Sequence, residues 1–275
     1  VTGAAHALGA LDHELARVAF SHRWDGCIPE VAPDEIAFVE ATFSPLAEAL
    51  AARGRGYTTL FLDLHGVAVL TGPNMGGKSA ALATTGFLCA CTALGVPPPA
   101  RAAALPLLDA IVWIGGEGPE DRARLLSSYA AEVVRARDTL ATASPRTLVL
   151  VDEFARTTGP REGRALLIAF AEALRERGAF ALIATHFDGV AEAAGAPHLR
   201  IAGVRIDQLE SVEPNDLDAA LDAINGAMDY RIVEAGATEP VSDALALARL
   251  LGLDARVVER ARALNDAPGW DPTGS

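Results

Sequence analysis

The chain has 275 residues, 51% of them hydrophobic, so it is long enough to bury a large core in one domain with or without appendages. The formal net charge of −13 opposes extended contact with a polyanion, because phosphate contacts need clustered Lys and Arg. No apolar run approaches about 18 residues and no basic-then-apolar signal opens the chain, so we expect a cytoplasmic protein without membrane contact.

The N-terminal stretch predicts one amphipathic helix over residues 7–20, because Leu8, Leu11, Leu15 and Val18 recur at three- and four-residue spacing. Gly and Pro in residues 24–33 end it. We interpret residues 1–33 as the end of a longer helix with its connector. The following segment, 34–240, reads as one α/β domain. It opens with a helix-like stretch at 44–54 and two β-type runs, 58–64 and 67–72, which we expect to pair in one sheet.

A glycine-rich turn follows the second β-type run. Residues 72–79 read GPNMGGKS and fit the phosphate-binding pattern G-x-x-x-x-G-K-[ST], in which backbone N–H groups and a helix N-terminus surround phosphate oxygens. Lys78 is the single lysine of the chain, whereas the other 22 basic residues are arginine, which indicates a site that needs a compact ammonium. Ser79 offers a hydroxyl for Mg²⁺. Tyr57, upstream, either lies under an adenine ring or is a sheet-edge tyrosine.

Residues 79–95 predict a helix that carries Cys89 and Cys91, which we expect to be buried and reduced. Residues 109–116 predict a strand that stops at two glycines, and 120–140 predict a helix. Ser127 and Ser128 lie near the start of that helix, where capping explains them adequately.

Two further strands bring polar side chains to their carboxyl ends. The apolar run at 147–151 ends in Asp152 and Glu153. Asp152 is suited to hold the water shell of Mg²⁺, and Glu153 to orient or deprotonate the attacking water. The alternative is a solvated strand end without such a role. The run at 180–184 is followed by His186, for which we favour contact with a γ-phosphate over the alternative of a core histidine. We therefore expect three βα units to aim at one crevice.

Beyond this point, residues 199–206 and 230–236 predict strands, and 215–229 predict an acidic helical insert. Residues 241–264 predict two helices broken at Gly252, and 265–275 resemble a disordered tail.

Four motifs resemble those of one family. TGPNMGGKS at 71–79 is similar to the Walker A loop of the MutS family, whose Pro-Asn-Met filling is more specific than the general pattern. VDEFARTTGPREG at 151–163 resembles its Walker B motif and D-loop, ATHF at 184–187 its His switch, and SSYAAEV at 127–133 its Ser-Thr-Phe signature helix. Residues 241–264 look like its C-terminal helical pair.

The resemblance implies an α/β P-loop NTPase fold, the ABC-type ATPase head of MutS type with a C-terminal helical dimerisation element. It implies ATP and Mg²⁺ as cofactors and a homodimer, or a pair with a MutS-like paralogue, through the ATPase face. Lys78, Glu153 and His186 would be catalytic, and Ser79 and Asp152 would hold the metal. The nucleotide would contact Tyr57, Gly72, Pro73, Asn74, Met75, Gly76, Gly77, Lys78, Ser79 and Ala80 of one subunit and Ser127 of the other.

Departures from the family pattern fall beside these motifs. Ala80 stands where the family has Thr, and Ala155 and Thr157 replace glycines of the D-loop. None of these changes removes a phosphate or Mg²⁺ ligand, so ATP hydrolysis is still expected.

The function implied is coupling of Mg-ATP binding to movement of attached arms that recognise mismatched or branched DNA. The DNA contact would lie in domains absent from this chain. Two alternatives stay open: a MutS-like chaperone ATPase that reactivates a cobalamin-dependent aminomutase without binding DNA, and a nucleotide-gated dimer without turnover.

Overall fold

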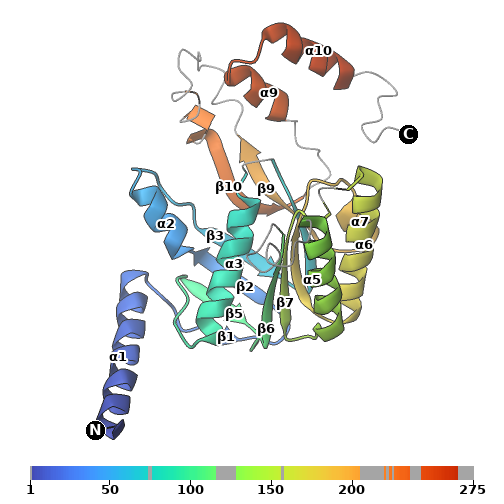
Figure 1. The fold of residues 1–275 in the computed structure, drawn as a ribbon. Coiled ribbons are helices and arrows are strands. Elements are labelled where there is room, and N and C mark those ends of the chain that lie inside the picture. Colours follow the sequence, from blue (N-terminus) through green and yellow to red (C-terminus); the bar gives the residue numbers. More distant parts are fainter. Residues whose placement is uncertain are drawn as a thin grey trace.

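The computed structural model describes residues 2–73, 76–115, 128–155, 158–204, 220, 223–224, 226–235 and 243–265 (Figure 1). Its helices are α1 (Thr2–Arg23), α2 (Ser44–Ala51), α3 (Lys78–Ala93), α5 (Ser128–Thr142), α6 (Pro160–Glu176), α7 (Val190–Ala194), α9 (Asp243–Leu250) and α10 (Ala255–Asn265). Its strands are β1 (Glu30–Val31), β2 (Ile36–Ala41), β3 (Leu60–Leu64), β4 (Val67–Thr71), β5 (Ala102–Leu105), β6 (Ala110–Ile114), β7 (Thr147–Asp152), β8 (Phe180–Ala184), β9 (His198–Val204) and β10 (Met228–Glu234).

The described strands form two sheets. The larger has the order β10-β9-β4-β8-β7-β6, in which the five strands from β9 to β6 run parallel and β10 joins the edge antiparallel. The smaller has the order β1-β5-β2-β3. The mixed α/β class predicted from the sequence is therefore confirmed.

The expected pairing of the two β-type runs before the glycine-rich turn is wrong. β3 pairs with β2 in the smaller sheet, whereas β4 lies between β9 and β8 in the larger one. The burial patterns give the reason: β3 alternates buried and exposed side chains, as a half-covered antiparallel strand does, but β4 has four consecutive buried residues, as a central parallel strand does. Gly66, with a φ of 76°, lies in the turn between them.

The larger sheet separates two hydrophobic cores, because successive side chains of a strand point to opposite faces. Leu148 and Leu150 of β7 pack on one face with Leu82 and Leu88 of α3 and with the smaller sheet. Val149 and Val151 of the same strand pack on the other face, together with residues of α6 and α7. Figure 1 shows α3 on one side of this sheet and α5, α6 and α7 on the other. Cys89 and Cys91 are free and buried, as expected.

The two ends of the chain are helical. α1 extends away from the sheets, and its apolar stripe is exposed, with Leu8, Leu11, Leu15 and Val18 all more than half accessible (Figure 1). The predicted break between the last two helices is confirmed at Gly252, whose φ is 84°. The predicted tail at 265–275 lies outside the described residues, apart from the last residue of α10, as does most of the acidic insert at 215–229. Within the described part, no helix has the length and apolarity that a membrane span requires.

Candidate nucleotide-binding site

The site lies at the carboxyl ends of three neighbouring parallel strands, β4, β8 and β7. The glycine-rich turn follows β4, Asp152 ends β7, and His186 comes two residues after β8. Their register aligns these ends, since Leu70 pairs with Ala184 and Ala184 with Asp152. The carboxyl edge of a parallel sheet is where α/β proteins bind ligands.

Two glycines of the turn have backbone conformations that suit glycine alone. Gly72 has a φ of 146°, and a Cβ there would lie 2.9 Å from the Cβ of Ile201. Gly77 has a φ of 89°, and a Cβ there would lie 2.9 Å from the ring of Tyr230. Gly76 donates its backbone N–H to the Pro73 carbonyl at 2.9 Å. The turn thus brings its backbone against β9 and β10, while the predicted contacts Asn74 and Met75 lie outside the described residues.

Lys78 begins α3 and is only 6% exposed. Its ammonium donates to the carbonyl oxygens of Gly72, at 2.8 Å, and Pro73, at 3.2 Å. Burial lowers the pKa of Lys78 below the ordinary lysine value, and the negative charges of Glu153 and Asp152 partly oppose that shift. Both acids therefore act electrostatically on the ammonium, although they come from a different strand.

Asp152 is the last residue of β7, and Glu153 begins the turn that follows it. Glu153 donates its backbone N–H to the Ala184 carbonyl at 3.0 Å, and its φ is 54°, which is unusual for a residue with a Cβ. Gly115, where β6 ends, approaches this turn so closely that a Cβ would lie 2.5 Å from the Asp152 carbonyl oxygen. The sequence indicated Gly115 only as the end of a strand, whereas the structure shows that the close approach of the Asp152 backbone leaves no room for a side chain there.

The remaining predicted residues are placed as follows. Ser79 is exposed in the first turn of α3, and its hydroxyl and the Asp152 carboxylate are the hard oxygen donors that Mg²⁺ prefers. His186 is exposed, and its ring centroid lies 4.4 Å from that of Phe187. Ser127 lies outside the described residues, so the structure gives it no position.

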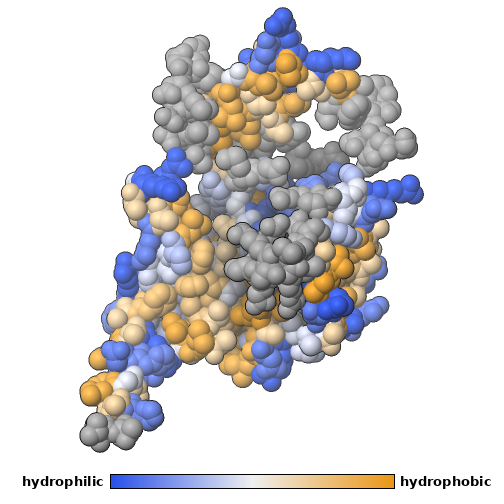
Figure 2. Space-filling model, viewed as in Figure 1, coloured by the Kyte–Doolittle hydropathy of each residue, from blue (hydrophilic) through white to orange (hydrophobic). Residues whose placement is uncertain are grey.

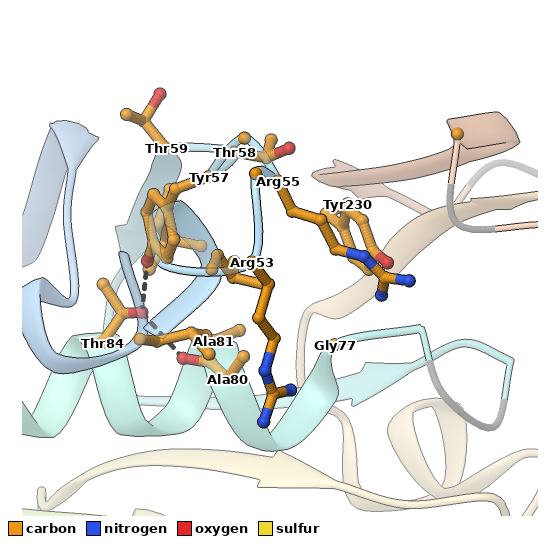
Figure 3. A pocket seen from close by; sticks show the side chains of 16 residues that line it. Arg53, Arg55, Tyr57, Thr58, Thr59, Gly77, Ala80, Ala81, Thr84 and Tyr230 are labelled. Atoms are coloured by element: carbon orange, nitrogen blue, oxygen red, sulfur yellow. Dashed lines mark hydrogen bonds between the residues drawn. The ribbon is translucent and has the colours of Figure 1, made fainter. Parts of the chain in front are cut away.

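A pocket of about 590 Å³ adjoins the start of α3 (Figure 3). Its lining combines α2, the loop before β3, the first turns of α3 and residues near β10, namely Leu46, Leu50, Arg53, Gly54, Arg55, Gly56, Tyr57, Thr58, Thr59, Leu60, Gly77, Ala80, Ala81, Thr84, Gly226 and Tyr230. Gly77 and Ala80 belong to both the glycine-rich motif and this wall. A ligand held by the turn therefore has a neighbouring chamber of mostly apolar and aromatic character.

Tyr57 lies in this wall, and its position is fixed by its hydroxyl. That oxygen accepts the backbone N–H of Phe43 at 3.0 Å and lies 3.1 Å from the Thr84 hydroxyl, which in turn donates to the Ala80 carbonyl at 2.7 Å. Thr84 belongs to α3, so the tyrosine is tied to the helix that starts with Lys78.

Tyr230 is a wall residue that the sequence interpretation missed. It lies on β10, and its ring lies against Gly77 (Figure 3). Burial raises its pKa, and the positive charge of Arg55 opposes that shift. In Figure 3, Arg55 points toward Tyr230, while Arg53 points toward the first turn of α3. The strand predicted at 230–236 overlaps β10, but the pattern carried no signal that β10 would pair with β9 and bring Tyr230 against Gly77.

Comparison with known proteins identifies the family. The model of MutS domain V matches residues 68–267. The DNA mismatch repair protein MutS of Granulibacter bethesdensis is 35% identical over 219 residues, which are 76% of this chain and 23% of that protein. MutS of Thermus thermophilus is 34% identical over 203 residues, which are 74% of this chain and 23% of that protein. The endonuclease MutS2 of Anaeromyxobacter sp. is 35% identical over 197 residues, which are 71% of this chain and 22% of that protein. This chain thus spans about a quarter of these relatives' length, and it belongs to the MutS family through domain V.

Proposed function

We propose that this chain is an ABC-type P-loop ATPase domain that binds Mg-ATP and hydrolyses it. The observation that carries the proposal is the ammonium of the buried Lys78, which begins α3 and lies within electrostatic reach of Asp152 and Glu153 at the end of β7. Both acids lie at the end of one buried strand and their negative charges act on the same cation, and such a group of charges matches a magnesium-bound phosphate. The relatives' identity as MutS proteins supports the same conclusion.

The phosphate chain is assigned to the glycine-rich turn. Backbone N–H groups of the glycine-rich turn, other than at Pro73, which has none, would donate to phosphate oxygens, and the Lys78 ammonium would exchange its carbonyl partners for them. Ser79 and Asp152 would hold Mg²⁺, which would neutralise charge on the phosphoryl oxygens. Glu153 would accept a proton from the attacking water, and His186 would contact the γ-phosphate.

The nucleoside is assigned to the adjoining pocket. Tyr57 and Tyr230 offer aromatic faces from different elements, and a purine ring is flat and apolar enough to stack on either. The tie between Tyr57 and Thr84 holds one ring in place before the ligand binds. This arrangement favours stacking over the sheet-edge alternative for Tyr57.

We assign a dimer contact to the last two helices. Leu251, Leu253 and Val257 are between 42% and 51% exposed, and Figure 2 shows apolar residues at the surface of this helical pair. A second copy, or a MutS-like paralogue, would cover them and bring its Ser127 to the nucleotide.

Helix α3 offers a route from the nucleotide to the arms. Lys78 begins the helix, and Phe87, in its second half, contacts the rings of Phe20 in α1 and Phe43. The Arg17 guanidinium of α1 also donates to the Gly95 carbonyl just beyond α3. A shift of the glycine-rich turn would therefore move α1. The relatives reported above are repair and endonuclease proteins, which supports DNA-recognising arms and gives the chaperone alternative no support.

ATP titration by calorimetry together with a phosphate-release assay tests the proposal. Glu153→Gln should bind ATP and turn over about 10²- to 10⁴-fold more slowly, as loss of a general base does. Lys78→Ala should lose ATP affinity. Glu176→Ala, which changes an exposed carboxylate at the end of α6, is the matched control and should behave as the unaltered chain. Parent-rate hydrolysis by Glu153→Gln, or undiminished ATP binding by Lys78→Ala, would contradict the corresponding assignment.

A further inference from the structure

The turn that carries Glu153 is strained at two positions. Glu153 has a φ of 54° and Ala155 a φ of 62°, and neither is glycine. The left-handed conformation costs roughly 1–2 kcal/mol for a residue with a Cβ. Strain of this kind persists only where surrounding groups hold the backbone in place.

Glu132 of α5 is the group that holds Ala155. Glu132 is 5% exposed, and its carboxylate oxygen Oε2 accepts the backbone N–H of Ala155 at 2.9 Å. The Ala155 carbonyl is bonded too, since it accepts the Thr158 hydroxyl at 2.8 Å and the Thr158 N–H at 3.1 Å. Charge-assisted hydrogen bonds are stronger than neutral ones, and a buried carboxylate needs such a partner. Both polar groups of the strained residue are therefore fixed.

The connection from Ala155 back to Glu153 is short and rigid. Phe154 lies between them, is 4% exposed, and packs its ring 5.6 Å from that of Phe170 in α6. Glu153 is bonded at its own N–H to Ala184 of β8. The segment 153–155 is thus held at three points, by β8, by α6 and, through Glu132, by α5.

We propose that Glu132 is a positioning residue, which sets the orientation of Glu153 by holding Ala155. This inference rests on the proposed function, because it concerns the same hydrolytic site. If Glu132 has this role, the position of α5 affects the hydrolysis rate, because a displacement of Glu132 would shift the Ala155 backbone through their hydrogen bond. The effect belongs to turnover and not to ATP affinity, because Glu132 is bonded to the turn after β7, which carries the proposed general base.

Four variants of the 275-residue chain test this role: Glu132→Ala, Glu132→Gln, the Glu176→Ala control, and Glu132→Ala combined with Ala155→Gly. Glu132→Ala should lower kcat about 10- to 100-fold, with the ATP dissociation constant unchanged within about twofold. Glu132→Gln keeps a carbonyl acceptor for the Ala155 N–H and should recover most of kcat. In the double variant, glycine relieves the strain, so thermal stability should rise while kcat stays low.

Three results would overturn the role. Unchanged kcat in Glu132→Ala is the first. Equal losses in kcat and in ATP affinity, which indicate general damage, are the second. Recovery of kcat together with stability in the double variant is the third, because it would make Glu132 merely structural. Absence of phosphate release from the unaltered chain would instead refute the proposed function itself, and the role of Glu132 with it.

Discussion

The contact between Gly77 and Tyr230 allows the start of α3 to be tested with a matched pair of substitutions. Gly77→Ala places a Cβ at a φ of 89° and 2.9 Å from the ring of Tyr230. Gly66→Ala places a Cβ at a φ of 76°, where it meets no atom within 4 Å. The second variant therefore measures backbone strain alone, and the first adds the displacement of an aromatic wall residue.

The expected magnitudes follow from the geometry. Gly66→Ala should lower the free energy of unfolding by about 1–2 kcal/mol, the cost of left-handed backbone. Gly77→Ala carries the same cost, and the ring must also retreat by about 0.6 Å to reach an ordinary carbon–carbon distance. Overpacking of this kind costs about 1–3 kcal/mol, so the total should be about 2–5 kcal/mol.

Urea unfolding followed by circular dichroism gives the two free energies, and calorimetry gives the ATP affinities. Gly77→Ala should weaken ATP binding because Tyr230 lines the proposed nucleoside pocket, whereas Gly66→Ala should not. When Tyr230 is already replaced by alanine, Gly77→Ala should lower the free energy of unfolding only as much as Gly66→Ala does. Equal destabilisation by the two single variants would refute the predicted steric contact.

Three further predictions concern charge, thiols and packing. Burial lowers the pKa of Lys78 in the free chain, and bound phosphate should raise that pKa. ATP affinity should therefore be constant below the pKa of the free chain and fall as the pH rises through that value. Calorimetry in buffers of different ionisation enthalpy detects the proton uptake on binding, and Lys78→Arg should abolish this uptake. Burial raises the pKa of Cys89 to about 12 and of Cys91 to about 11, so both should resist a thiol reagent near about pH 8 until the chain is unfolded. Phe87→Ala should lower the free energy of unfolding by about 2–3 kcal/mol, measured in urea, whereas Leu94→Ala, at an exposed position beyond the same helix, should change it by less than about 0.5 kcal/mol.

Prediction from sequence succeeded where the signal is local. The strands β4, β7 and β8 are runs of apolar residues long enough to be buried on both faces, so each is recognisable on its own. The polar residues that follow them are close in sequence, so Lys78, Asp152 and His186 could be proposed as site residues without knowledge of the packing. The same reasoning failed for the partner of β3, because strand pairing depends on contacts distant in sequence, and it passed over β1, β2 and β5, which are short or alternate weakly.

The amino-acid sequence by itself determined the family of this chain, the buried strands β4, β7 and β8, and the polar residues that follow them, because each of these is encoded in neighbouring positions. Tertiary structure alone decided that Tyr230 faces the first turn of α3, that Gly115 lies against Asp152, and that Glu132 holds Ala155. These contacts join residues far apart in sequence. They depend on the order of strands in the sheet and on the helices packed against it, which no short stretch of sequence specifies.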